Sequence, residues 1–109
     1  MMITVIAMGE LRSFLQENLP HYEDPVVYIS SDFIPGCPKC NSSATVYYVK
    51  LEERSSIPSD SNVANVKNHK FPIDIFVKYP VLKGPPQQIV IGTKETKGET
   101  QMILRRVAE

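Results

Sequence analysis

The stretch Pro35-Gly36-Cys37-Pro38-Lys39-Cys40 contains the only two cysteines of the chain, and they stand three positions apart. That spacing allows the two sulfurs to close a small disulfide ring, or to bind one metal ion from a single turn. The prolines and the glycine around the pair predict a loop. The elements on either side of this loop decide which chemistry the pair can perform.

Length and composition predict a single domain that covers residues 1–109 and has enough hydrophobic residues, 42%, to form a core without a disulfide framework. The 12 basic and 12 acidic residues balance, so the total charge favours neither nucleic acid nor membrane. The apolar segment Ile3 to Met8 follows no positive segment and is too short to span a bilayer, so we expect no signal peptide and no membrane segment. The expected location is the reducing cytoplasm, where a close cysteine pair is typically catalytic or metal-binding.

The first third of the chain predicts a strand, a helix and a second strand. Ile3 to Met8 is short, apolar and rich in β-branched residues, as in a buried strand. Apolar residues then recur at helical spacing until Pro20, which places a helix within Glu10 to Leu19. Val26 to Ser30 predicts the second strand, and the cysteine loop follows it.

The segments after the cysteines are less regular. Ala44 to Glu53 is rich in Thr, Val and Tyr, which favours a strand, with a helix as the alternative. Ser55 to Asn68 is polar and predicts a long loop. Phe71 to Tyr79 and Gln87 to Thr93 predict two further strands, which we expect in the same sheet as the first two.

The last segment, Glu99 to Ala108, follows a turn and predicts a helix, because Ile103, Leu104 and Val107 can face a core together. A β-hairpin with the preceding strand is the alternative. Together these elements predict an α/β or α+β fold with a small central mixed β-sheet and one clear N-terminal helix.

The cysteine hexapeptide resembles the active-site turn of glutaredoxins and their thioredoxin-fold relatives, and strand, helix, strand, then Cys-x-x-Cys is also the thioredoxin order. Lys78-Tyr79-Pro80-Val81 with the following Gly84-Pro85-Pro86 resembles the segment that brings a cis-proline beside the two sulfurs. The resemblance implies a thioredoxin-like sheet and a cis peptide bond at Pro86, or alternatively at Pro85. It implies a protein disulfide or glutathione as partner, with no cofactor.

The resemblance further implies a small thiol–disulfide oxidoreductase in which Cys37 is the nucleophile and Cys40 resolves the mixed disulfide. A cysteine at a helix N-terminus is stabilised as the attacking thiolate by unpaired N–H groups and the helix dipole. Pro38 would stiffen the turn, Lys39 would add positive charge, and Pro86 would position the substrate strand. This activation needs a helix after the pair, whereas the sequence there favours a strand.

The cysteine pair also fits half of a zinc site. Cys37 and Cys40 with Asn41 after them are typical of a zinc knuckle, in which the residue after the second cysteine often needs a positive φ that Asn tolerates. His21 and His69 are the only histidines that could complete a Cys₂His₂ site, or two chains could share one zinc. This alternative predicts a binding module of transcription or nucleic-acid accessory type, the one case in which we expect nucleic acid as a partner.

A third hypothesis is a non-catalytic structural or assembly protein with two inert, reduced cysteines. Aromatic side chains would then make its contacts, besides packing in the core. The candidates are Tyr22, Tyr28, Tyr47, Tyr48 and Tyr79. No Ser–His–Asp spacing, phosphate-binding glycine loop or paired acidic general acid/base stands out in the sequence.

Overall fold

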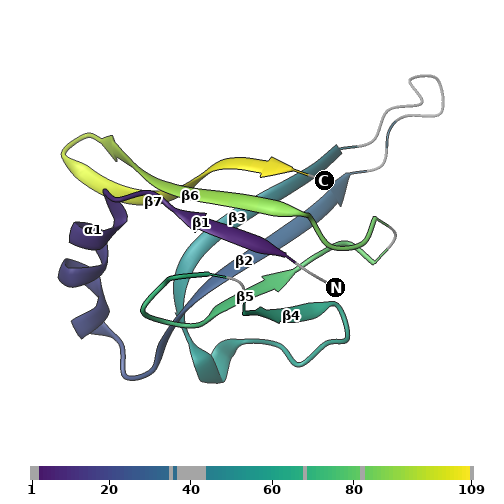
Figure 1. Cartoon of the computed structure of the whole chain (residues 1–109), viewed down its shortest axis with the longest axis horizontal. Coiled ribbons are helices and arrows are strands. Elements are labelled where there is room, and N and C mark those ends of the chain that lie inside the picture. Colours follow the sequence, from purple (N-terminus) through teal and green to yellow (C-terminus); the bar gives the residue numbers. More distant parts are fainter. Residues whose placement is uncertain (1–2, 35, 37–43, 68, 82, 109) are drawn as a thin grey trace.

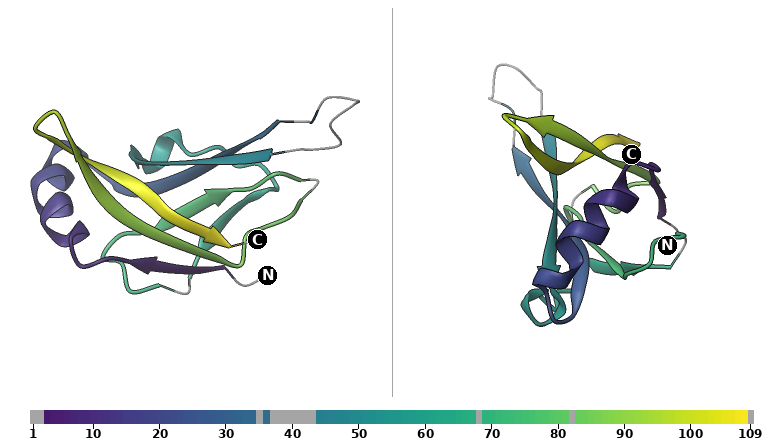
Figure 2. Two further views of the ribbon diagram at one scale, coloured as in Figure 1. Left: turned by 90° about the horizontal axis from the view of Figure 1, so that it is seen from above. Right: turned by 90° about the vertical axis from the view of Figure 1, so that its left-hand side faces the viewer.

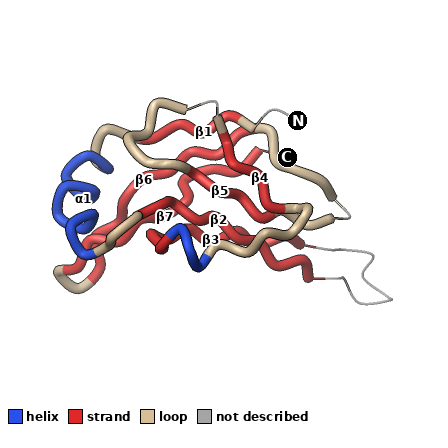
Figure 3. Tube along the Cα trace, turned by 90° about the horizontal axis from the view of Figure 1, so that it is seen from below, coloured by secondary structure: helices blue, strands red, loops and turns tan. Residues whose placement is uncertain are grey.

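The structure is a computed structural model, and it describes residues 3–34, 36, 44–67, 69–81 and 83–108. Most of the described chain is strand, and the helices are confined to short segments (Figure 3). The elements in chain order are β1 (Thr4–Ala7), α1 (Leu11–Asn18), the 3₁₀-helix η1 (Leu19–His21), β2 (Pro25–Ile34), β3 (Ala44–Glu53), the 3₁₀-helix η2 (Arg54–Ser56), β4 (Val63–Val66), β5 (Ile75–Lys78), β6 (Gln88–Thr96) and β7 (Glu99–Ala108).

The described strands form two separate mixed sheets (Figure 1). The three-stranded sheet has the order β1-β6-β7, with β1 parallel and β7 antiparallel to β6. The four-stranded sheet has the order β3-β2-β5-β4, in which β2 and β5 are parallel and the other pairs antiparallel. The helix α1 lies across one end of the molecule, beside the β6–β7 hairpin (Figure 2).

The predicted single thioredoxin-like sheet is therefore wrong. The strands expected to share one sheet are divided, because β1 pairs with β6 whereas β2 pairs with β5. The reason is that a strand has only two edges. One edge of β2 is paired along its whole length with β3, from Pro25 opposite Glu53 to Ile34 opposite Ala44, and the other edge takes β5. From Val27 to Ile29, both edges of β2 are therefore paired and β1 cannot add there.

The predicted C-terminal helix is also wrong, and the hairpin alternative is confirmed. Lys97 and Gly98 have positive φ values of 53° and 81°, the conformation of a type I′ turn that matches the twist of two paired strands. The turn places Thr96 opposite Glu99, and β7 then runs back along β6. The sequence did not reveal this hairpin because its turn has Lys97 at the first central position, where Asn, Asp or Gly is the usual signal. Without that signal, the apolar spacing of Glu99 to Ala108 favoured a helix.

Several local predictions are confirmed. The helix predicted within Glu10 to Leu19 is α1, with Leu11 and Leu15 buried, and the strand predicted from Ala44 to Glu53 is β3 with the same bounds. The long loop predicted for residues 55–68 is partly wrong, because β4 lies inside it and pairs with β5. No described helix is long and apolar enough to cross a membrane.

Alternate residues of the central strands form the core, as expected for strands that turn one face inward. Val27 and Ile29 of β2, Ile75 and Val77 of β5, and Ile89 and Ile91 of β6 all have no exposed surface. Side chains from both sheets and from α1 belong to this one cluster. The helix is therefore held by the same core that joins the two sheets.

Candidate functional site

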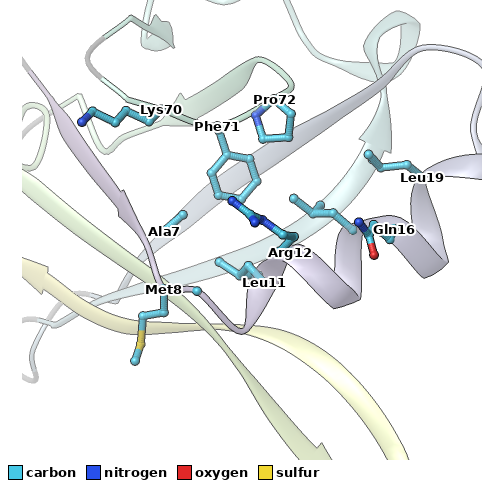
Figure 4. A pocket seen from close by; sticks show the side chains of 11 residues that line it. Ala7, Met8, Leu11, Arg12, Gln16, Leu19, Lys70, Phe71 and Pro72 are labelled. Carbon is cyan, nitrogen blue, oxygen red and sulfur yellow. The ribbon is translucent and has the colours of Figure 1, made fainter.

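A cleft of about 910 Å³ lies between α1 and the segment Lys70-Phe71-Pro72, which precedes β5 (Figure 4). Its volume falls within the range of small-molecule sites, roughly 300–1,000 Å³. The end of β1, the helix and the β4–β5 connection all contribute to its walls. The lining residues are Ala7, Met8, Gly9, Leu11, Arg12, Leu15, Gln16, Leu19, Lys70, Phe71 and Pro72.

The floor of the cleft is apolar because of the spacing of leucines in and after α1. Leu11, Leu15 and Leu19 follow each other at four-residue intervals, so they lie on one face of the helix. Leu11 and Leu15 are 1% and 5% exposed, and Leu19 is partly buried against the same core. Phe71 also packs against this core from the other wall. The floor of the cleft is thus the outer surface of the hydrophobic core.

Arg12 and Lys70 make the rim of the cleft positive. Both residues are exposed, and no Asp or Glu lines the cleft. Neither cation has a carboxylate partner in the part of the chain that the structure describes. The ion-paired cations of that part belong to other regions: Lys50, Arg54, Lys78 and Arg105. The cleft is therefore electrostatically complementary to an anion.

Glu10 holds the beginning of α1 against the three-stranded sheet. Its Oε1 accepts a hydrogen bond from the backbone N–H of Thr93 at 2.9 Å. Arg105 donates from Nη2 to the Thr93 carbonyl oxygen at 2.6 Å, and the same nitrogen lies 3.6 Å from Glu10 Oε1. The hydrogen bond from Thr93, assisted by the charge of Arg105, holds the pKa of Glu10 below its usual value. These contacts fix the helical wall of the cleft.

His69 supports the opposite wall. Its Nδ1 accepts a hydrogen bond from the backbone N–H of Phe71 at 2.9 Å, and the two rings meet edge to face with centroids 6.3 Å apart. An accepting Nδ1 means that a neutral His69 carries its proton on Nε2. This predicted metal ligand thus has a structural contact beside the cleft.

Cys37, Pro38, Lys39 and Cys40 lie outside the described residues, so the roles predicted for them stay predictions. Their flanks are described: the pairing of β2 with β3 reaches Ile34 and Ala44. After Cys40, the described chain resumes at Ala44, where β3 begins.

Pro86 is buried just before β6, and the described residues contain no cis peptide bond, so the cis bond predicted at Pro86 or Pro85 is absent. The segment before it nevertheless lies beside the end of β2. Lys83 Nζ is 5.8 Å from the centroid of the Phe33 ring. The fold therefore brings this segment to the same end of the four-stranded sheet as the beginning of the cysteine loop.

The two histidines lie at the other end of that sheet. His21 ends η1, shortly before β2 begins. His69 follows β4, and the last residue of β4, Val66, pairs with Ile75. Ile75 in turn pairs with Val27, near the beginning of β2. The ten residues of β2 extend over about 30 Å at roughly 3.3 Å per residue. The structure thus does not bring His21 or His69 toward the cysteine loop. Within the described ranges, no group of three or more His, Cys, Asp and Glu could hold a metal ion.

Comparison with protein-family models, with curated proteins and with solved structures finds no match to this chain. Function is therefore inferred from the cleft itself. The cleft was missed in the sequence because its walls come from segments about 60 residues apart, Leu11 to Leu19 and Lys70 to Pro72. One sequence feature could have indicated the cleft. Arg12 lies next to the apolar face formed by Leu11, Leu15 and Leu19, and no acidic residue three or four positions away could pair with it.

Proposed function

We propose that this protein is a small-molecule binding module, and that its cleft between α1 and Lys70-Phe71-Pro72 takes a mostly apolar ligand. The observation that supports the proposal most strongly is the apolar floor at the surface of the core. The distance from Leu11 to Leu19 along a helix is about 12 Å at 1.5 Å per residue. A ligand of that length could lie along the floor.

The chemistry of the lining supports binding. Its side chains are aliphatic, aromatic, cationic or amide, and none is a carboxylate, imidazole, hydroxyl or thiol. Apolar surface with a few polar groups at fixed positions is typical of small-molecule sites. Removing ~200 Å² of ligand surface from water contributes about 5 kcal/mol, part of which is offset by lost freedom of motion. We therefore expect dissociation constants in the micromolar to millimolar range.

A neutral fluorescent probe, N-phenyl-1-naphthylamine, tests the proposal, because its emission rises in apolar surroundings. We expect saturable binding at one site per chain. Gln16→Trp places a large ring at the cleft and should weaken binding by roughly tenfold, since it occupies ligand volume. The matched control is Gln101→Trp, at an exposed position of β7 that does not line the cleft. Equal loss in both variants would exclude this function, and so would failure of both this probe and its anionic relative 8-anilinonaphthalene-1-sulfonate to bind.

A second candidate function rests on the cysteine pair, and one observation favours metal binding over disulfide exchange for it. Cys37 and Cys40 belong to the connection between two antiparallel strands, with β3 following at once. A cysteine pair can bind one metal ion from a short connection, whereas activation by a dipole requires a helix, for which at most residues 37–43 are available before β3. With both histidines near the other end of the sheet, zinc would have to be shared between two chains.

Elemental analysis of protein purified without chelator tests this second candidate. One zinc per two chains, lost in Cys37→Ser, would support it. Metal-free protein in which Cys37 is alkylated much faster than Cys40 would instead support the oxidoreductase hypothesis, with a protein disulfide or glutathione as partner.

A further inference from the structure

We infer that the ligand of the cleft is an amphipathic carboxylate, an apolar chain or ring with one acidic group, whose carboxylate is bound by Arg12 and Lys70. This inference rests on the proposed function and adds the chemical class of the ligand. A medium-chain fatty acid is the simplest molecule of that class. Its chain would lie along the leucine floor and its acid would lie at the rim.

The first argument is the placement of the two cations on opposite walls. Arg12 extends from α1 toward the ring of Phe71, and Lys70 belongs to the other wall next to that ring (Figure 4). In this view the Lys70 ammonium points away from the Arg12 guanidinium, so Arg12 meets an anion between the walls directly and Lys70 would turn toward the cleft to reach it. A guanidinium also binds a carboxylate through two parallel hydrogen bonds, which orients the ligand as well as attracting it.

The second argument is that this charge is uncompensated. Four cations of the described chain are held by carboxylates, as in Arg54 with Asp24 at 2.9 Å and with Asp74 at 2.8 Å, whereas Lys67, Lys94, Lys97 and Arg106 resemble Arg12 and Lys70 in having no such pair there. Arg12 and Lys70 have no such partner within the described ranges, and no acidic side chain lines the cleft. A bound carboxylate would supply the missing countercharge.

The third argument is the separation of polar and apolar parts within the cleft. Arg12 and Lys70 lie toward the end of β1, and Leu19 lies at the far end of the helix (Figure 4). Gln16 is one helical turn beyond Arg12 and is the remaining polar side chain of the lining. An anion with a tail matches this order of groups, whereas a ligand charged at both ends does not.

Two probes with almost the same apolar body test the inference: neutral N-phenyl-1-naphthylamine and its anionic relative 8-anilinonaphthalene-1-sulfonate. We expect the anion to bind wild-type protein roughly tenfold more tightly than the neutral probe, and high salt to reduce this preference. Arg12→Gln and Lys70→Gln should each remove about threefold or more of the anion's affinity and leave the neutral probe unaffected. Octanoate should displace the anionic probe at lower concentration than octanol does.

Lys83→Gln is the matched control, because it removes the same charge near the end of β2, away from α1. It should leave both probes unchanged. Equal affinity of wild-type protein for the two probes, or displacement by octanol as good as by octanoate, would overturn the inference and leave the binding function standing. Failure of both probes to bind would instead overturn the proposed function. If a variant does not fold, the salt dependence of the anionic probe's affinity for wild-type protein still tests whether the cleft binds a negative charge.

Discussion

The carboxylate of Glu10 accepts a hydrogen bond from the backbone N–H of Thr93, 83 positions further along the chain. The contact ties the residue before α1 to β6. Two features of the hairpin β6–β7 permit it. First, Gly92 has no side chain that would occupy the space of Glu10 and Arg105. Second, the register shift near Ile91 leaves Arg105 without an opposite residue in β6, and the Arg105 side chain donates a hydrogen bond to the Thr93 carbonyl oxygen. A bulge and a glycine thus set the position of the helical wall of the cleft.

Gly92→Ala should destabilise the protein by about 1–3 kcal/mol, as overpacking does in a tight site. A Cβ at this position would come within 2.7 Å of Glu10 Oε1, 2.8 Å of Arg105 Nε and 2.9 Å of Arg105 Cγ. Denaturation by urea measures the loss. Gly9→Ala is the control, since its Cβ would meet nothing within 4 Å, and it should change stability by no more than about 0.5 kcal/mol. Equal stabilities of the two variants would show that Arg105 moves aside without cost.

Glu10 should make the stability of the protein depend on pH in the acidic range. The hydrogen bond from Thr93 lowers the pKa of Glu10 in the folded state below its usual 4.5. Its contribution is then fully present above the unfolded pKa and is lost as the pH falls through the folded pKa. Wild-type protein should exceed Glu10→Gln in stability at neutral pH, and the difference should shrink on acidification. Urea denaturation at a series of pH values tests this, and a difference independent of pH would contradict it.

Arg54 joins two carboxylates that lie far apart in the sequence. It donates to Asp24 Oδ2 and Asp74 Oδ2, and its guanidinium carbon lies 5.7 Å from the centroid of the Phe76 ring. Since these groups are well exposed, we expect Arg54→Met to destabilise the protein only slightly, and less again in high salt. The hydrogen bond from Arg54 lowers the pKa of Asp74, so that pKa should rise toward its usual value in the variant. NMR titration measures it, and an unchanged Asp74 pKa would show that the contact does not persist in solution.

The two cysteines should lack strong thiolate activation in metal-free protein. A helix beginning at Cys37 is limited to the seven residues before β3, and Asn41, Ser42 and Ser43 among them are poor helix formers, so we expect little stabilisation from a helix dipole. Both Cys37 and Cys40 should therefore react with iodoacetamide at rates near that of a free thiol with pKa of roughly 8.5. Mass spectrometry of each labelled peptide over time measures the two rates. A much faster reaction of Cys37 would require another source of activation, with Lys39 as the nearest candidate in the sequence.

Local signals were enough to predict the elements whose stability depends mainly on near neighbours. The leucine spacing and Pro20 predicted α1, and the β-branched and aromatic residues of Ala44 to Glu53 predicted β3. The pattern of the final segment fitted a helix and a strand alike. The turn at Lys97-Gly98 decided between them, because it reverses the chain and brings Glu99–Ala108 alongside β6 as its antiparallel partner.

The candidate site could not be predicted in the same way. The cysteine motif drew attention because it is contiguous, whereas the cleft depends on residues 70–72 meeting α1. Residues 70–72 lie opposite α1 because β5 pairs with β2 and because Glu10, before α1, is hydrogen-bonded to Thr93. Neither contact is signalled by a periodic pattern of residues in the sequence.

By itself, then, the sequence determined which short segments are helix or strand in its first half, and that a cysteine pair follows the second strand. Only the tertiary structure decided how the strands divide into two sheets and where the cleft opens. The physical reason is that secondary structure reflects the side chains of adjacent residues, whereas strand partners compete for a limited number of edges. β2 pairs with β3 along one edge and with β5 from Val27 to Ile29 along the other, whereas β1 pairs with β6, which begins at residue 88.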